Sequence, residues 1–279
     1  MNLTQTLPKL ALLAILLALH FHCHTQNPIL LSNKSLAQGG TGVAEKGYSS
    51  IHSNPSGSAY ITNSSVSANY HMPYFTKEIS SQNISLISPT KLGVFHSIIS
   101  RYGYKYYNES FFTLGYAKPF SEKFSISFQL NLQHNQIPES GNGSQLFSSF
   151  GFIFSPHPHL NIGFFTLNPE KSKIKIAQET ETIDSYFNLG FRWNATDQFA
   201  ISSEISHQIS YSTITRFGLE YKINKTIRTR AGIYGKPISY TMGLGITINN
   251  FTIDSSLANH MVLGLSSGIG VSYTIKTKQ

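Results

Sequence analysis

Charge is scarce in this sequence. Only 12% of the 279 residues are Asp, Glu, Lys or Arg, whereas these residues make up about 25% of an average soluble domain. A soluble protein keeps its surface hydrated mainly with such side chains, so a chain poor in them either buries its surface or exposes it to lipid. The 21 basic and 13 acidic residues are also dispersed along the chain, and we therefore expect no nucleic-acid partner.

Cysteine and long apolar runs are equally scarce. The apolar run Leu10–Leu19 follows the basic Lys9 and is too short to cross a bilayer as a helix. This pattern is typical of a secretory signal peptide, and we expect residues 1–25 to be removed during Sec export. The single cysteine, Cys23, would leave with that peptide, which excludes a disulfide in the mature chain. The bulky residues 20–22 before it are unfavourable for lipidation.

What the chain has in abundance is alternation of apolar and polar residues. The clearest example is Phe124–Gln133, where the even-numbered positions are Phe, Ile or Leu and the odd-numbered ones are Ser, Gln or Asn. Successive side chains of a strand point to opposite faces, so the two faces of this segment meet different surroundings. No helical period competes with such segments along the chain. The alternation therefore indicates an all-β fold.

Counting the alternating segments predicts about fourteen strands, each of about ten residues as in outer-membrane barrels. They lie near residues 65–74, 79–88, 91–101, 109–118, 123–134, 145–155, 159–167, 184–194, 197–208, 211–223, 226–235, 238–248, 250–257 and 262–275. Short turns alternate with longer connections, among them residues 101–108, 135–144 and 168–182. This asymmetry is typical of an antiparallel up-and-down transmembrane β-barrel with periplasmic turns. We assign residues 64–279 to the barrel.

The apolar face could also be the inside of a soluble sandwich, which alternates in the same way. Three features favour lipid: the strands are long, the polar face consists of Ser, Gly, Asn, Thr and Gln rather than Lys and Glu, and tyrosines lie near segment ends. We expect these tyrosines to form the aromatic girdles of an outer-membrane protein in contact with lipid. They are Tyr60, Tyr74, Tyr102, Tyr104, Tyr211 and Tyr234.

Eight charged side chains fall on the inward face in the predicted strands. Charges cannot face hydrocarbon at low cost, so the fold places them in the lumen. Two interpretations stay open: a ladder of charges that holds the barrel together, or a lining that selects anionic solutes. The residues are Arg192, Glu204, Arg216, Glu220, Lys222, Arg228, Arg230 and Asp254. No catalytic motif surrounds the histidines, and we predict no catalytic residue, no metal site, no cofactor and no enzymatic activity.

Two short elements precede the first strand, residues 36–44 (LAQGGTGVA) and residues 53–59 (SNPSGSA). Their pairing resembles the opening of the FadL-type transporters of hydrophobic compounds and of their PorV-like relatives in Bacteroidetes. In that group an AxGG[AT]GVA element precedes NPAGLA. Residues 244–254 (LGITINNFTID) also resemble the penultimate hairpin of the group.

The resemblance implies that residues 26–63 fold back as a plug in the barrel. A cap on the periplasmic rim is the alternative. Glycines in this segment permit positive φ angles and close packing, and the Asn-Pro pair sets a turn. The residues concerned are Gly39, Gly40, Gly42, Asn54, Pro55 and Gly57.

Two functions are compatible with such a barrel. The first is passive uptake or binding of a small hydrophobic or amphipathic compound. The second, implied by the PorV-like resemblance, is an adaptor or component of a type IX-like secretion system that contacts secretion-machinery proteins, or else a structural porin-like role. An apolar pocket inside the lumen would favour uptake, whereas a completely filled lumen would favour the second group.

Overall fold

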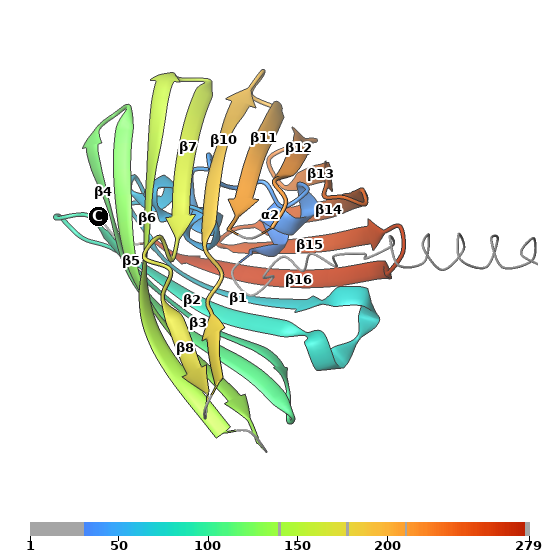
Figure 1. The fold of residues 1–279 in the computed structure, drawn as a ribbon. Helices are drawn as coiled ribbons and strands as arrows, with labels where there is room; N and C mark the ends of the chain where they lie inside the picture. The colour runs from blue at the N-terminus through green and yellow to red at the C-terminus, as the bar shows by residue number, and fades with distance from the viewer. Residues whose placement is uncertain (1–30, 139–140, 177–178, 210, 277–279) are drawn as a thin grey trace, which may run out of the picture.

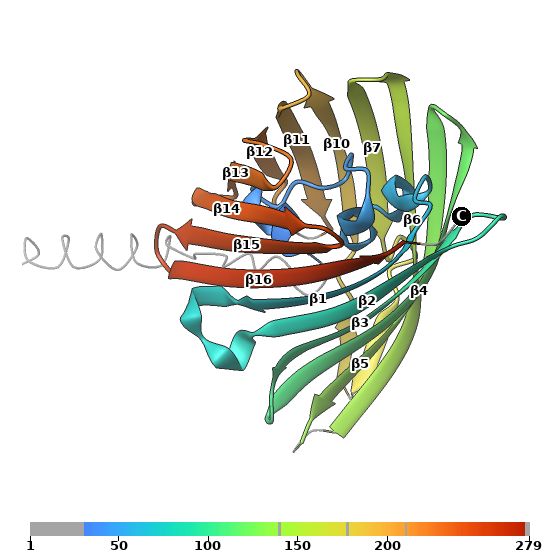
Figure 2. The same ribbon diagram turned by 180° about the vertical axis from the view of Figure 1, so that it is seen from behind.

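The computed structural model describes residues 31–138, 141–176, 179–209 and 211–276. The predicted signal peptide, residues 1–25, and the first residues of the predicted plug lie outside this part of the chain. Within it, fourteen antiparallel strands close into a barrel (Figures 1 and 2). The predicted fold class is therefore confirmed.

Each barrel strand pairs with its neighbours along the chain, and β1 pairs with β16 to close the barrel. The one interruption is a small separate hairpin of β8 (Lys173–Ile176) and β9 (Glu179–Thr182), so that β7 pairs with β10. The barrel strands are β1 (Ser64–Met72), β2 (Ser81–Pro89), β3 (Val94–Tyr104), β4 (Tyr107–Ser121), β5 (Phe124–Ile137), β6 (Gly141–His157), β7 (Leu160–Leu167), β10 (Tyr186–Asn194), β11 (Phe199–Gln208), β12 (Ile214–Lys222), β13 (Ile227–Tyr234), β14 (Ser239–Ile248), β15 (Phe251–His260) and β16 (Gly264–Ile275).

The two ends of the barrel differ. Short turns join the strands at the end where β1 begins at Ser64 and β16 ends at Ile275. The opposite end carries the longer connections, including the β8–β9 hairpin and two short 3-10 helices, η4 (Pro73–Phe75) and η5 (Lys77–Ile79). Short turns are periplasmic in outer-membrane barrels. We therefore call the first the periplasmic end and the second the mouth.

The predicted long connections are partly wrong. The loop predicted over residues 101–108 is a tight turn, because β3 and β4 continue pairing up to Tyr104 and Tyr107. Part of the loop predicted over residues 168–182 forms the β8–β9 hairpin, in which Ile174 and Ile176 pack against Phe147 of β6 in a buried apolar cluster. Polar and aromatic residues at the mouth interrupt the alternation, although their backbones still pair.

The two faces of the strands differ as predicted. Leu130 in the middle of β5 has 44% of its surface exposed on the outside, whereas its neighbour Gln129 is 4% exposed and faces the lumen. Exposed Phe, Leu, Ile and Tyr side chains cover the outer wall on the other strands as well. Such an apolar exterior on a closed barrel matches hydrocarbon rather than water. None of the helices in the part of the chain that the structure describes could span a membrane.

Residues 31–63, which we call the N-terminal segment, lie inside the barrel (blue in Figures 1 and 2). The segment contains α2 (Asn33–Ala37) and two 3-10 helices, η2 (Tyr48–His52) and η3 (Pro55–Ser58). The Ser32 side chain caps α2, and the Asn54 side chain caps η3 with Pro55 at its first position. These are the residues that helix starts prefer, so the local sequence fixes where each turn begins.

Candidate functional site

Backbone hydrogen bonds tie the first half of the N-terminal segment to the barrel wall. One carboxylate oxygen of Glu204, on β11, accepts the amides of Gly42 and Val43 at 2.9 and 3.1 Å. The Gly39 amide donates to the Thr241 hydroxyl at 2.9 Å, and Arg216 donates to the carbonyl of Gly40 at 3.4 Å. Gly39 and Gly40 both have positive φ angles, of 69° and 73°, which glycine adopts without steric cost.

The second half is held through the Asn-Pro turn. The Asn54 amide donates to three carbonyls, that of Val43 at 2.7 Å and those of Phe152 and Phe164 on the wall at 3.0 and 3.2 Å. Beyond Pro55, the backbone passes so close to the carbonyl of Glu45 that a side chain at Gly57 would overlap it. The structure thus places each of the six residues predicted for a plug inside the lumen.

A chain of ion pairs crosses from the wall to the segment. Asp254 pairs with Arg230 at 2.5 Å, and Arg230 with Glu220 at 2.8 Å. Glu220 pairs with Arg192 at 2.7 Å, and Arg192 reaches Glu45 of the segment at 2.9 Å. Buried charges are normally paired in this way, because a buried charge without a partner is costly. The wall and the segment therefore share one alternating network.

The network continues within the segment, where Lys34 pairs with Glu45 at 2.6 Å. Burial disfavours the charged form of Glu45, but Arg192 and Lys34 outweigh burial and hold the pKa of the Glu45 carboxyl below its usual value. Glu45 is therefore ionised at neutral pH, and its charge contributes to holding the segment in place.

The predicted lumen lining divides into two groups. Six of the eight residues come together around the N-terminal segment: Arg192, Glu204, Arg216, Glu220, Arg230 and Asp254. The other two lie outside the network. Lys222 is exposed at the periplasmic end opposite Arg228, which donates to Thr247 at 2.9 Å.

An apolar pocket of about 120 Å³ lies above the segment at the barrel mouth. We call it the mouth pocket. Leu31 and Leu36 of the segment face Pro73 and Ile79 of the β1–β2 connection and Ile214 of β12 across it. The remaining lining residues are His71, Tyr74, Tyr102, Tyr234, Gly235, Lys236, Pro237, Ser239, Ala258, His260 and Ser266.

The mouth pocket corrects the predicted tyrosine girdles. Tyr74, Tyr102 and Tyr234 line the pocket rather than the outer wall. Tyr102 and Tyr234 fall on the inward face of β3 and β13, because the alternation places them in phase with buried residues such as Ser100 and Arg230. Position near a strand end alone did not reveal which side the ring faces.

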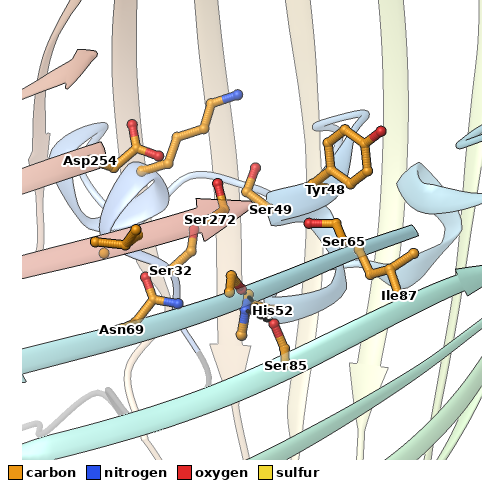
Figure 3. A pocket seen from close by; sticks show the side chains of 14 residues that line it. Ser32, Tyr48, Ser49, His52, Ser65, Asn69, Ser85, Ile87, Asp254 and Ser272 are labelled. Atoms are coloured by element: carbon orange, nitrogen blue, oxygen red, sulfur yellow. Dashed lines mark hydrogen bonds between the residues drawn. The ribbon is translucent and has the colours of Figure 1, made fainter. Parts of the chain in front are cut away.

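A second, polar cavity of about 40 Å³ lies below α2 on the periplasmic side. We call it the inner cavity. Ser32, Tyr48, Ser49 and His52 of the segment surround it together with Asn69 and other wall residues (Figure 3). The wall residues also include Ser65, Ser67, Ser85, Asp254 and Ser272. Among residues 31–138, 141–176, 179–209 and 211–276, no group of His, Cys, Asp and Glu could hold a metal ion.

The mouth pocket contains residues that the sequence did not single out, above all Leu31, Leu36 and His71. One sequence signal did mark the path of the segment, namely glycines at inward positions of the strands. A glycine inside a strand often allows another backbone to approach closely. At each of the following a side chain would meet the N-terminal segment: Gly151, Gly163, Gly190, Gly218, Gly232, Gly243 and Gly268.

Similar folds occur among solved structures. TodX, a toluene transporter of Pseudomonas putida, has a TM-score of 0.66 at 11% identity, over 87% of this chain and 97% of TodX. CymD, a monoaromatic hydrocarbon channel, has a TM-score of 0.68 at 12% identity, over 91% of this chain and 100% of CymD. A FadL homologue of Pseudomonas aeruginosa has a TM-score of 0.63 at 11% identity, over 88% and 98%.

Comparison with protein-family models and with curated proteins found no match. At identities of 10 to 12% the likeness to the solved structures is one of fold. The closed barrel, its apolar exterior and this likeness of fold all indicate that the chain lies in the outer membrane. The protein is an outer-membrane β-barrel with the fold of FadL-type channels.

Proposed function

We propose that the barrel takes up a small amphipathic compound passively and binds it first in the mouth pocket. The observation that carries this proposal is the apolar pocket itself, which opens at the barrel mouth and has Leu31 and Leu36 of the N-terminal segment as its floor. An apolar cavity of about 150 Å³ accommodates one benzene ring. A pocket of about 120 Å³ therefore suits a compound with a single ring or a short aliphatic body.

Polar atoms in the pocket favour an amphipathic compound over a pure hydrocarbon. The ring nitrogen Nδ1 of His71 is buried and has no hydrogen-bond partner among the described residues. Buried polar groups normally find such a partner. A hydroxyl group on the bound compound would provide one once the His71 ring turns this nitrogen toward the pocket, while the apolar body of the compound rests against Leu31 and Leu36.

Calorimetric titration of the detergent-purified protein with para-cresol and with toluene tests this proposal. The two probes have the same ring and methyl group and differ by one hydroxyl. We expect both to bind, with para-cresol the tighter. His71→Phe should remove the advantage of para-cresol and leave toluene binding in place.

A pair of matched substitutions locates the binding site. Ile214→Trp fills the mouth pocket and should abolish binding of both probes. Ile233→Trp places the same ring on the lipid-facing side of the adjacent strand β13, where the isoleucine is 40% exposed, and should leave binding unchanged. Equal binding by the wild type and the Ile214→Trp variant would rule out the mouth pocket as the site.

The alternative of a secretion adaptor lacks a supporting observation. A completely filled lumen would have favoured it, but the mouth pocket leaves apolar space inside the barrel. The similar structures named above are described as transporters or channels or as a FadL homologue. The PorV-like part of the resemblance and the origin in Bacteroidetes stay predictions.

A further inference from the structure

The two cavities lie on either side of a single residue, Asn33. In the N-terminal segment, Leu31 and Leu36 line the mouth pocket, whereas Ser32 and Lys34 line the inner cavity. Asn33 is fully buried and lines neither cavity. The wall residues that its side chain contacts show that it lies between an apolar space at the mouth and a polar space on the periplasmic side.

The wall residues are arranged in three corresponding levels, which are the mouth pocket, the level of Asn33 and the inner cavity. On β1, His71 lines the mouth pocket and Asn69 the inner cavity. On β15, Ala258 lines the mouth pocket and Asp254 the inner cavity, with Ser256 between them. The middle level of β15 is thus occupied by a residue that contacts Asn33.

The Asn33 side chain connects the strands at this level. Its Oδ1 accepts the Ser256 hydroxyl of β15 at 2.9 Å. Its Nδ2 donates to Asn69 Oδ1 at 3.2 Å and to the carbonyl of Tyr70 at 3.3 Å, both on β1. Asn69 in turn donates to Asn83 of β2 at 3.0 Å. One amide therefore bridges β15 and β1 and lies against β16 at the level between the two cavities.

The wall is shaped to receive this amide. Gly268 of β16 lies between Ser266, which lines the mouth pocket, and Gly270, which lines the inner cavity. A side chain at Gly268 would overlap Asn33 Oδ1, and one at Gly270 would overlap Asn69 Oδ1. Two glycines in alternate inward positions thus create the space in which the Asn33–Asn69 pair sits.

We propose that Asn33 is the gate between the mouth pocket and the inner cavity, and that the route through the lumen runs along the inner faces of β15, β16 and β1. The amide blocks the route while its hydrogen bonds to Ser256 and Asn69 are intact. A compound with a hydroxyl group opens it by accepting from the Ser256 hydroxyl and donating to Asn69 Oδ1 in place of the Asn33 amide, so that neither of these two wall groups is left without a partner. This inference rests on the proposed uptake function.

Asn33→Ala tests the gate in the full-length protein. The substitution removes the amide and joins the two cavities without adding bulk. We expect ion conductance in planar bilayers to rise above the wild-type level. The matched control is Asn161→Ala: Asn161 is 5% exposed, faces the lumen on β7 and bonds Ser155, but lines neither cavity, so conductance should stay at the wild-type level.

A second variant covers the case in which Asn33→Ala fails to assemble. Ser256→Ala removes only one of the bonds of Asn33 and should give a smaller rise in conductance. If every variant that assembles, Asn33→Ala or Ser256→Ala, has the wild-type conductance, the proposed gate is refuted. The titration with para-cresol separates the two claims. If para-cresol binds but Asn33→Ala does not change the conductance, the gate alone is refuted. If Asn33→Ala raises the conductance but para-cresol does not bind, the proposed ligand alone is refuted.

Discussion

Arg192 on the barrel wall and Glu45 in the N-terminal segment form an ion pair of 2.9 Å inside the lumen. The pair joins two parts of the chain that are far apart in the sequence. It also extends the wall network of Glu220 and Arg230 into the segment, where Lys34 completes it. The segment is thus held by charge as well as by its backbone hydrogen bonds.

This pair predicts how pH affects the docking of the segment. The pKa of Glu45 is lower in the docked state than its usual value, which is about 4.3 for a free glutamate. The carboxylate therefore contributes to docking above that usual pKa, and the contribution is lost as the pH falls through the lower, docked pKa. We expect amide exchange in residues 39–47, followed by mass spectrometry, to be slow at neutral pH and to accelerate, beyond the intrinsic pH dependence of exchange, in more acidic solution.

Glu45→Gln serves as the control for this pH dependence. It should loosen the segment already at neutral pH, because breaking a buried ion pair costs up to about 3 to 5 kcal/mol. Its own acid-induced change should be smaller than that of the wild type. Identical pH profiles of the two proteins would show that other carboxyl groups control docking.

The outward orientation of Leu130 predicts that an arginine there costs more folding free energy than an arginine at Leu92. Leu130→Arg places a charge on the outer wall in the middle of β5 and should cost about 2 to 4 kcal/mol of folding free energy if it meets the bilayer midplane. Leu92→Arg makes the same change in the exposed periplasmic turn between β2 and β3 and should cost about 1 kcal/mol or less. Urea titration of refolding into vesicles measures both, and equal costs would contradict the assigned membrane position.

The closed barrel predicts heat-modifiable migration on SDS gels. A closed barrel leaves no strand edge open, so the unboiled protein should resist SDS and migrate differently from the boiled one. Leu92→Arg should behave like the wild type in this assay. Identical migration before and after boiling would contradict closure between β1 and β16.

We predict that removal of residues 36–61 opens the lumen. The strand-to-strand hydrogen bonds do not depend on these residues, and the wall network stays balanced, because Arg192, Arg216 and Arg230 face Glu204, Glu220 and Asp254. The shortened chain should assemble, as judged by heat-modifiable migration, and conduct ions more strongly than the full chain. A shortened barrel that assembles but conducts ions no more strongly than the full chain would show that the segment does not close the lumen.

Much of the barrel was predictable because its strands obey a simple physical rule. Lipid on one side and a polar lumen on the other impose alternation, and Phe124–Gln133 shows it over its whole length. The pairs Glu204–Arg216 and Glu220–Arg230 lie directly opposite each other on adjacent strands, so strand phase alone brought their charges to the same face. The mouth was less predictable, because residues 101–108 extend the β3–β4 pairing without that alternation.

The cavities could not be predicted from strand phase. Leu31 and Tyr234 line the same pocket only because the barrel closes and the N-terminal segment folds into it. Asn33 carries no local signal of its own, and its partners Asn69 and Ser256 lie on strands from opposite ends of the chain. Only the inward glycines, such as Gly268, indicate in the sequence that another part of the chain passes close by.

The measurement that tests the uptake account most directly is the position of a bound ring. Crystals of the full-length protein soaked with para-bromophenol would show the bromine by its anomalous scattering. The account predicts bromine between Leu36 and Tyr234 in the wild type, and its loss from that place in the Ile214→Trp variant. Bromine found only on the lipid-facing wall, or within the lumen at a site unaffected by that substitution, would contradict it.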